Sequence, residues 1–350
     1  MKKDTSKKEG RKKLIWSLIF VGIALLTVWT VASQSKGFSF AEFQSYLKGA
    51  SAGWMVAAVL CMFGFIFFEG AAVLTICRGF GFSPKKRGGF IYAAADIYFS
   101  AITPSATGGQ PMSAYFMMKD GIPGLVVTVA LVLNLAMYTL AIVVINVLNL
   151  PFAADVYASF GPLSHVLIGL GALVQIALVV LYVFCLKNGS LLRRAGNWGI
   201  GLLARLHLLR QPEQKRQKLQ KKMDQYDEYA QMIKGRPMMV VRAFVYNLLQ
   251  RACIIAVSVC CFMATGGNGA LAAKIWGVQS CVTMGSVCVP IPGAMGVTDY
   301  LMLDGFDAWI SAQSAANLEM LSRALSFYIC VLICGISVFV KFLISKRREK

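Results

Sequence analysis

Long uninterrupted apolar runs constrain this chain more than any other feature of its sequence. They cover residues 14–33, 53–79, 124–149, 163–186, 238–264 and 319–343. A helix of about 20 apolar residues crosses the roughly 30 Å hydrocarbon core of a bilayer. With 57% apolar and only 15% charged residues, the chain has more apolar surface than a water-soluble domain hides. The runs therefore predict an all-α polytopic membrane protein with about six transmembrane helices.

Basic residues gather at the ends of these runs. Clusters within 2–13, 187–236 and 341–350 supply most of the net charge of +19. Lys and Arg concentrate on the cytoplasmic side of membrane proteins, beside anionic lipid. We therefore expect the N-terminus 1–13 and the tail 344–350 to be cytoplasmic, together with the central loop, and we expect no nucleic-acid partner.

Two further apolar segments, 88–118 and 270–318, are broken in the middle by Gly/Pro-rich stretches at 103–111 and 290–296. The placement of charge puts both ends of the first segment inside and both ends of the second outside. We predict two oppositely oriented re-entrant hairpins in an inverted repeat, a pattern of many transporters. The alternative is that each segment is an ordinary span with a kink.

These predictions divide the chain into a first membrane half at 14–186 and a second at 237–343, joined by the basic loop 187–236. The polar stretch 211–229 of that loop predicts a helix, which lies either on anionic lipid or in solvent. The loop is too short for an ordinary enzyme domain. The cysteines and histidines show no metal-binding spacing, so we expect no metal site, no cofactor and no catalytic residue.

Ionisable side chains within apolar runs are the best functional pointers in a membrane protein, since each costs about 2.5–3.5 kcal/mol when unpaired. They are Glu69, Asp96, Arg251, Asp299 and Arg323. One interpretation is structural ion pairing between helices. The other is a polar cavity in which the arginines bind a phosphate and the carboxylates bind a cationic head group. Proline and glycine at the breaks would stop helices and let the backbone line that cavity.

The predicted substrate-binding residues combine these charges with the two breaks. They are Glu69, Asp96, Thr103, Pro104, Gly108, Gly109, Gln110, Arg251, Pro290, Pro292, Gly293, Gly296, Asp299 and Arg323.

Three motifs carry a resemblance to a known family. They are Ile102–Pro111 (ITPSATGGQP), Lys119-Asp120-Gly121 and Pro290–Asp299 (PIPGAMGVTD). In this order they resemble the lysylphosphatidylglycerol synthase transmembrane-region family, the flippase-like half of the bacterial multiple peptide resistance factor. The resemblance covers about residues 10–345. It implies a bacterial cell membrane protein that moves aminoacylated phosphatidylglycerol between leaflets and thereby protects against cationic peptides.

This sequence departs from the family pattern at two places. Many relatives carry Glu where this chain has Gln110, and a Gly-Gly pair and Glu where it has Gly293-Ala294 and Asp299. A carboxylate is thus kept at position 299 but not at position 110. Full-length relatives also carry a soluble transferase domain, and this sequence ends soon after the last apolar run. We therefore expect that this polypeptide does not transfer lysine by itself.

Three functions follow as hypotheses. The first is translocation of a phospholipid such as lysyl-phosphatidylglycerol, or of a polyprenyl-phosphate-linked sugar. The second is a membrane subunit that supplies lipid to a separate soluble lysyltransferase or glycosyltransferase docked on the central loop. The third is a scaffold that transports nothing. Close-packing glycines also permit a homodimer.

Overall fold

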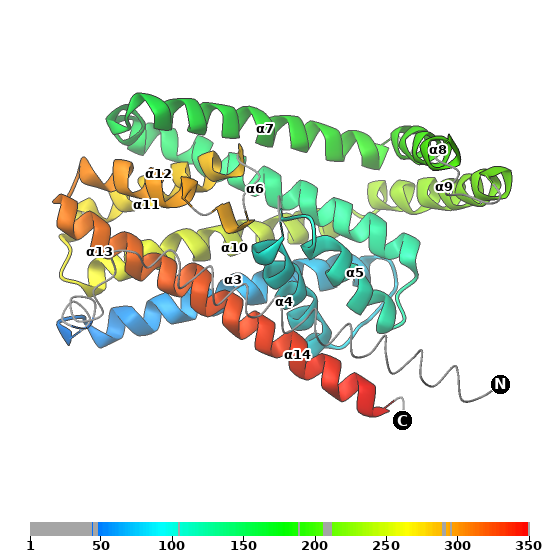
Figure 1. Ribbon diagram of the computed structural model, residues 1–350, viewed down its shortest axis with the longest axis horizontal. Helices are drawn as coiled ribbons and strands as arrows, with labels where there is room; N and C mark the ends of the chain where they lie inside the picture. Colours follow the sequence, from blue (N-terminus) through cyan, green and yellow to red (C-terminus); the bar gives the residue numbers. More distant parts are fainter. Residues whose placement is uncertain are drawn as a thin grey trace. The chain divides into compact units, whose positions relative to one another are not determined.

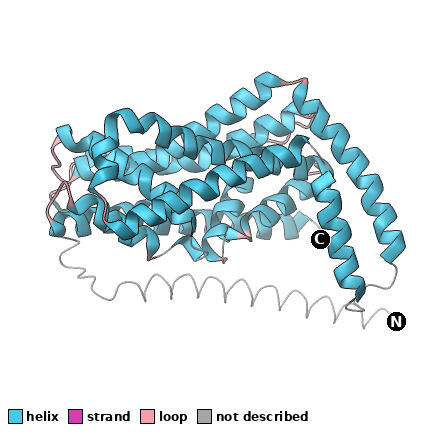
Figure 2. Ribbon diagram, turned by 90° about the horizontal axis from the view of Figure 1, so that it is seen from above, coloured by secondary structure: helices cyan, strands magenta, loops and turns pink. Residues whose placement is uncertain are grey.

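The part of the chain that the computed structural model describes consists of helices joined by short turns and loops, and Figure 2 shows no strand there. Described are residue 44 and residues 48–103, 106–187, 190–205, 212–288, 292–294 and 296–348. Residues 50–350 form one compact unit. The predicted first span at 14–33 and the basic N-terminus at 1–13 lie outside the described residues.

Five helices are long and apolar enough to cross a membrane. They are α3 (Ala52–Gly79), α6 (Gly124–Ser159), α7 (Pro162–Lys187), α10 (Pro237–Ala264), and the continuous run of α13 (Ala312–Arg323), the π-helical turn η5 (Ala324–Ile329) and α14 (Cys330–Arg348). Each coincides with a predicted apolar run. The prediction of an all-α polytopic membrane protein is confirmed.

Two predicted boundaries are wrong. The predicted run ends at residue 149, but α6 continues through Pro151 to Ser159. Tertiary contacts on both sides of the proline hold this extension, because Asn149 Nδ2 donates to Ser280 Oγ at 2.7 Å and Lys274 pairs with Asp155. Proline removes one helical hydrogen bond but does not end a helix that its neighbours hold.

The second correction concerns the broken segment 270–318. Its last part belongs to α13, whose first residue is Ala312. Ser311 caps this helix, since its Oγ accepts from the backbone N–H of Ser314 at 3.3 Å. A serine cap starts a helix where apolar periodicity alone gives no boundary.

The segments predicted to lie inside meet at one end of the bundle. There Lys341 Nζ lies 3.4 Å from Asp120 Oδ1, and the ring of Phe80 meets the ring of Tyr229 edge-on. At the other end the backbone N–H of Ser51 donates to the carbonyl of Ala264 at 2.7 Å. The two ends of the bundle therefore separate the segments as the charge pattern predicts.

The two broken segments occupy opposite halves of the bundle. The first consists of α4 (Lys86–Ile102) and α5 (Gly109–Lys119), and the second of α11 (Ala272–Gly285), the 3-10 turns η3 (Ser286–Cys288) and η4 (Pro292–Ala294), and α12 (Val297–Asp307). Figure 1 shows α11 and α12 at its left, α4 near its centre and α5 to the right of α4.

Each broken segment folds back on itself. Tyr92 OH in α4 donates to Asp120 Oδ2, just after α5, at 2.7 Å. In the second segment, Lys274 near the start of α11 pairs with Asp155, and Asp304 near the end of α12 accepts from the N–H of Gly161 at 2.8 Å. Both pairs thus return to the end from which they start. That they are re-entrant in a membrane stays a prediction.

The outer surface is apolar where α7 lies and the core is centred on α6. In α6, 61% of the spanning window is buried, against 17% in α7. Large exposed side chains of α7 include Leu173, Ile176 and Val180. A face of this kind requires lipid around it.

The central basic loop contains two helices, α8 (Ser190–Arg205) and α9 (Pro212–Lys234). The second coincides with the helix predicted at 211–229. The first was not predicted from the sequence. A short 3-10 turn, η2 (Gly269–Leu271), precedes α11.

Candidate functional site

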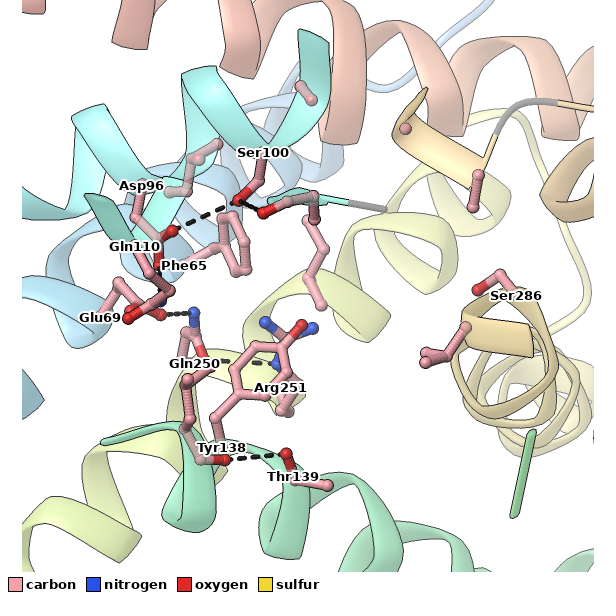
Figure 3. Close-up of a pocket in the computed structure, with 18 of the residues that line it drawn as sticks. Phe65, Glu69, Asp96, Ser100, Gln110, Tyr138, Thr139, Gln250, Arg251 and Ser286 are labelled. Atoms are coloured by element: carbon pink, nitrogen blue, oxygen red, sulfur yellow. Dashed lines mark hydrogen bonds between the residues drawn. The ribbon is translucent and has the colours of Figure 1, made fainter. Parts of the chain in front are cut away.

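A cavity of about 810 Å³ lies where the two broken segments meet. Its walls come from α3, α4, α5, α6, α7 and α10, from the turns η3 and η4, and from the π-helical turn η5. Figure 3 shows the polar side chains that face it. Irregular backbone at membrane depth is tolerated where it lines such a space.

The first broken segment contributes a carboxylate and an amide to this cavity. Gln110 Nε2 in α5 donates to Asp96 Oδ2 in α4 at 2.8 Å. The hydroxyl of Ser100 donates to the other oxygen of Asp96 at 3.3 Å. The bond from Gln110 crosses the break and the bond from Ser100 lies within α4, and together they fix the Asp96 carboxylate at the cavity wall (Figure 3).

A second carboxylate, that of Glu69 in α3, is held by neutral amides. Asn134 Nδ2 in α6 donates to Glu69 Oε1 at 3.0 Å, and Gln250 Nε2 in α10 donates to Glu69 Oε2. Asn247 Nδ2 donates in turn to Asn134 Oδ1 at 3.0 Å. Glu69 is only 4% exposed. Amide donors stabilise a buried carboxylate without cancelling its charge, so the charge stays available to a cation.

Arg251 in α10 brings a guanidinium into the same cavity. It is 7% exposed, and its Nε donates to Gln250 Oε1 at 3.3 Å. Its Cζ lies 3.8 Å from the ring centroid of Tyr138 and 5.4 Å from that of Phe65. Among the described residues, no carboxylate forms an ion pair with it. The aromatic rings and the amide therefore orient a cation whose charge is not neutralised by direct pairing.

Two atoms of side-chain amides at the cavity lack a hydrogen-bond partner in the described part of the chain. They are Nε2 of Gln175, a residue of α7 that is 2% exposed, and Oε1 of Gln110. Buried polar atoms are nearly always bonded, and each exception calls for a reason. Both residues line the cavity, although the two unpaired atoms are themselves enclosed by protein.

The second broken segment approaches the cavity through its backbone. Gly293 in η4 has a φ of +62°, and a Cβ there would lie 2.4 Å from Phe327 Cζ. Phe327 lines the cavity from η5. Glycine at this position allows both the left-handed backbone and the close approach of the ring. π-Helical turns recur at functional sites, and this one places an aromatic side chain against the break.

The carboxylate of the second segment pairs with an arginine of α13. Arg323 Nε lies 2.8 Å from Asp299 Oδ1, and the backbone N–H of Gly296 donates to Asp299 Oδ2 at 2.9 Å. Neither Arg323 nor Asp299 lines the cavity. Here the contacts follow the interpretation of a structural ion pair between helices.

The predicted site residues thus fall into three groups. Glu69, Asp96, Gln110, Arg251 and Gly293 line the cavity. Outside its lining lie Thr103, Gly108, Gly109, Gly296, Asp299 and Arg323. Pro104 and Pro290 lie outside the described residues, and Pro292 begins η4.

Thr103 and Gly108 shape the first turn rather than the cavity wall. Thr103 Oγ1 donates to the carbonyl of Phe99 at 2.6 Å and accepts from the N–H of Gly108 at 2.9 Å. These bonds close the turn after α4.

Sequence reasoning missed the amides around the charges. Asn134, Asn247 and Gln250 belong to the hydrogen-bond network of Glu69 and Arg251, and Gln175 lines the same cavity. They are uncharged, so a search for ionisable groups passes over them. The available signal was four amides within long apolar runs, where a polar side chain needs a partner.

The fold and this cavity define a class: a polytopic all-α membrane protein with a charged internal cavity between two broken helix pairs. The family model for the lysylphosphatidylglycerol synthase TM region matches residues 14–334, and the chain belongs to this family. The resemblance drawn from the motifs is therefore confirmed. Comparison with curated proteins found no match.

Proposed function

We propose that the protein moves a phospholipid with an aminoacylated head group, such as lysyl-phosphatidylglycerol, between the leaflets of a bacterial membrane. The observation that carries the proposal is the Arg251 guanidinium, which is buried, has no carboxylate ion-pair partner in the described part of the chain, and faces a cavity that Glu69 and Asp96 also line. By lowering the negative charge of the outer leaflet, this movement would protect the cell against cationic peptides.

The charges of the cavity complement those of such a head group. A phosphodiester carries one negative charge, which a guanidinium binds through paired N–H groups. A lysyl ester adds two amines, for which Glu69 and Asp96 are the counterions. Gln175 and Gln110 also line the cavity and add amide groups to its walls.

The two broken segments supply the means of access. They enter the bundle from opposite ends and meet at the cavity. In transporters with inverted repeats, motion of one repeat against the other exposes a central site to each side in turn. We propose that α4–α5 and α11–α12 act in this way.

The test is transport by the purified full chain in liposomes that contain lysyl-phosphatidylglycerol. A membrane-impermeant amine reagent reports how much of the lipid reaches the outer leaflet. Arg251→Gln removes the cavity cation, and hydrogen bonds to charged groups contribute about 1.5–3 kcal/mol, so we expect transport to slow by about 10- to 100-fold. Arg242→Gln is the matched control, because Arg242 is exposed on the same helix.

Two results would contradict the proposal. One is transfer no faster than in empty liposomes for lysyl-phosphatidylglycerol, alanyl-phosphatidylglycerol and unmodified phosphatidylglycerol alike. The other is an Arg251→Gln protein that folds and transports at the wild-type rate.

A further inference from the structure

The helix α8 lies across the end of a spanning helix. It begins at Ser190, directly after α7 ends at Lys187. Figure 1 looks nearly along the axis of α8 and shows α7 lengthwise, and Figure 2 agrees with this crossing. A helix that turns sideways where a span ends has the orientation of an interfacial helix, which lies in the plane of the head groups.

One face of α8 is covered by α9. A Cβ on Gly196 would lie 2.7 Å from Leu219 Cδ2, and Arg193 forms an ion pair with Asp224 at 3.1 Å. The helix α9 is itself anchored to the bundle, since Tyr226 is fully buried and its hydroxyl donates to the carbonyl of Cys185 at 3.4 Å. The pair therefore holds α8 in a fixed orientation at this end.

Arg194, Trp198 and Arg205 lie on another face of α8. At about 100° per residue these three positions fall within one narrow stripe of the helix. Trp198 is 71% exposed, and both arginines are exposed as well. We call this surface the Arg-Trp-Arg stripe. A tryptophan this exposed between two cations is not explained by packing within the described residues.

We propose that the Arg-Trp-Arg stripe binds the anionic head groups of the membrane leaflet in which α7 ends. Tryptophan favours the interface because its ring is apolar and its N–H is polar. Arginine near the surface is attracted by anionic lipid. The short connection from α7 keeps the stripe within reach of the head groups, which favours lipid over a soluble protein as its occupant.

This assignment differs from the sequence-based expectation, which considered lipid contact only for the helix at 211–229, with solvent as the alternative. The helix α9 in that region is strongly polar, and its apolar residues Met223 and Tyr226 are buried against the protein. The helix that presents an exposed aromatic residue is α8. The proposal concerns attachment at the membrane surface and does not depend on what the cavity transports.

The test measures how deeply Trp198 sits in the membrane. The full chain is reconstituted in phosphatidylcholine vesicles with and without phosphatidylglycerol, and tryptophan emission is quenched with lipids brominated near the head group. Subtracting the signal of Trp198→Phe isolates this residue from the other tryptophans. We expect Trp198 to be quenched, and quenched more when phosphatidylglycerol is present. Salt should weaken that dependence, since it screens exposed charges.

A charge variant and a matched control complete the experiment. Arg194→Gln with Arg205→Gln should abolish the effect of phosphatidylglycerol on Trp198. Arg216→Gln with Lys221→Gln removes the same charge from exposed positions of α9 and should preserve it.

Two outcomes overturn the proposal. If Trp198 is unaffected by brominated lipid but quenched by aqueous acrylamide in both vesicles, the stripe faces water and suits a soluble partner instead. If both double variants abolish the lipid effect equally, the attraction belongs to the overall basic charge and not to the stripe.

Discussion

The two breaks share a sequence pattern but use their polar groups differently. In the first, Asp96 is bonded to Gln110 and Ser100 and its carboxylate faces the cavity. In the second, Asp299 is tied to Arg323 and lies outside the cavity lining. A Gly/Pro break with a nearby carboxylate therefore has two outcomes, one open to a ligand and one closed by an ion pair.

The glycines of the two breaks differ as well. A Cβ on Gly109 would lie 2.0 Å from Ser100 Oγ and 2.1 Å from Asp96 Oδ1. Gly296 has a φ of +80°, yet nothing lies within 4 Å of a Cβ built on it. The first glycine is required for space and the second for backbone conformation. Substitutions at each break should therefore fail for different reasons.

The largest effect is expected at the closed break. Arg323→Ala leaves Asp299 without its cation, and removing one partner of a buried pair costs about 3–5 kcal/mol. Because Asp299 is 25% exposed, we expect the lower end, about 3 kcal/mol, in denaturant unfolding of the protein in detergent. Arg251→Ala, at the cavity in α10, should lower the stability less, since it removes a cation with no ion-pair partner among the described residues.

The double variant Arg323→Ala with Asp299→Ala is the control for this comparison. It removes both charges and should recover much of the stability that Arg323→Ala loses. If the double variant is less stable than the single one, the ion pair is not what closes the second break.

The next effect is expected at Gly109. The added methyl of Gly109→Ala would displace Asp96 or Ser100, and overpacking of this kind costs about 1–3 kcal/mol. We expect a loss of about 2 kcal/mol in the same unfolding experiment, accompanied by slower lipid transport. A Gly109→Ala protein as stable as the wild type would show that the first turn is not close-packed.

A smaller effect is expected at Gly296. At φ +80° and ψ −49° the backbone is strained for a residue with a Cβ, which costs about 1–3 kcal/mol, and here no steric clash adds to it. Gly296→Ala and Gly296→Asn should therefore both lose about 1 kcal/mol, because Asn tolerates the left-handed helical region at positive ψ and not this one. A Gly296→Ala protein as stable as the wild type would show that the backbone conformation does not require glycine.

The smallest effect is expected at Asp155, in the part of α6 that extends beyond its membrane span. A hydrogen bond from Lys274 lowers the pKa of the Asp155 carboxyl below its ordinary value. A lowered pKa stabilises the folded state above the unfolded pKa of about 3.9, and this contribution fades as the pH falls below it. Asp155→Asn should slightly lower Tm at pH 7, and the difference should shrink as the pH is lowered below about 3.9. A difference that does not change with pH would assign the effect to packing.

Much of the fold follows from hydropathy and charge. The helices α3, α6, α7, α10 and α14 coincide with apolar runs because lipid selects for apolar length. The breaks near Gly109 and Gly293 follow from residues that cannot continue a helix or that favour other conformations. These features are local in the sequence, and local chemistry is enough to predict them.

The contents of the cavity are less predictable because they depend on pairings between distant helices. Glu69 and Arg251 stand out as charges, but their partners Asn134 and Gln250 look like tolerated polar residues in apolar runs. From the sequence alone, Arg323 is as good a candidate for the binding site as Arg251. Only the packing of α12 against α13 shows that Arg323 is already paired.

The π-helical turn gives the last helix two phases. In α13 the buried positions include Ala315, Leu318 and Ser322, and at helical spacing the same face should continue at Ile329. Ile329 is exposed, and the buried face resumes one residue later, at Cys330.

That single residue is the one that a π turn adds between hydrogen-bonded groups. The α13 part of the helix therefore faces α12, where Arg323 pairs with Asp299. The α14 part is offset by one position and meets α4, where Tyr98 lies against Gly335. One continuous helix thus packs in two different registers, one against each broken segment.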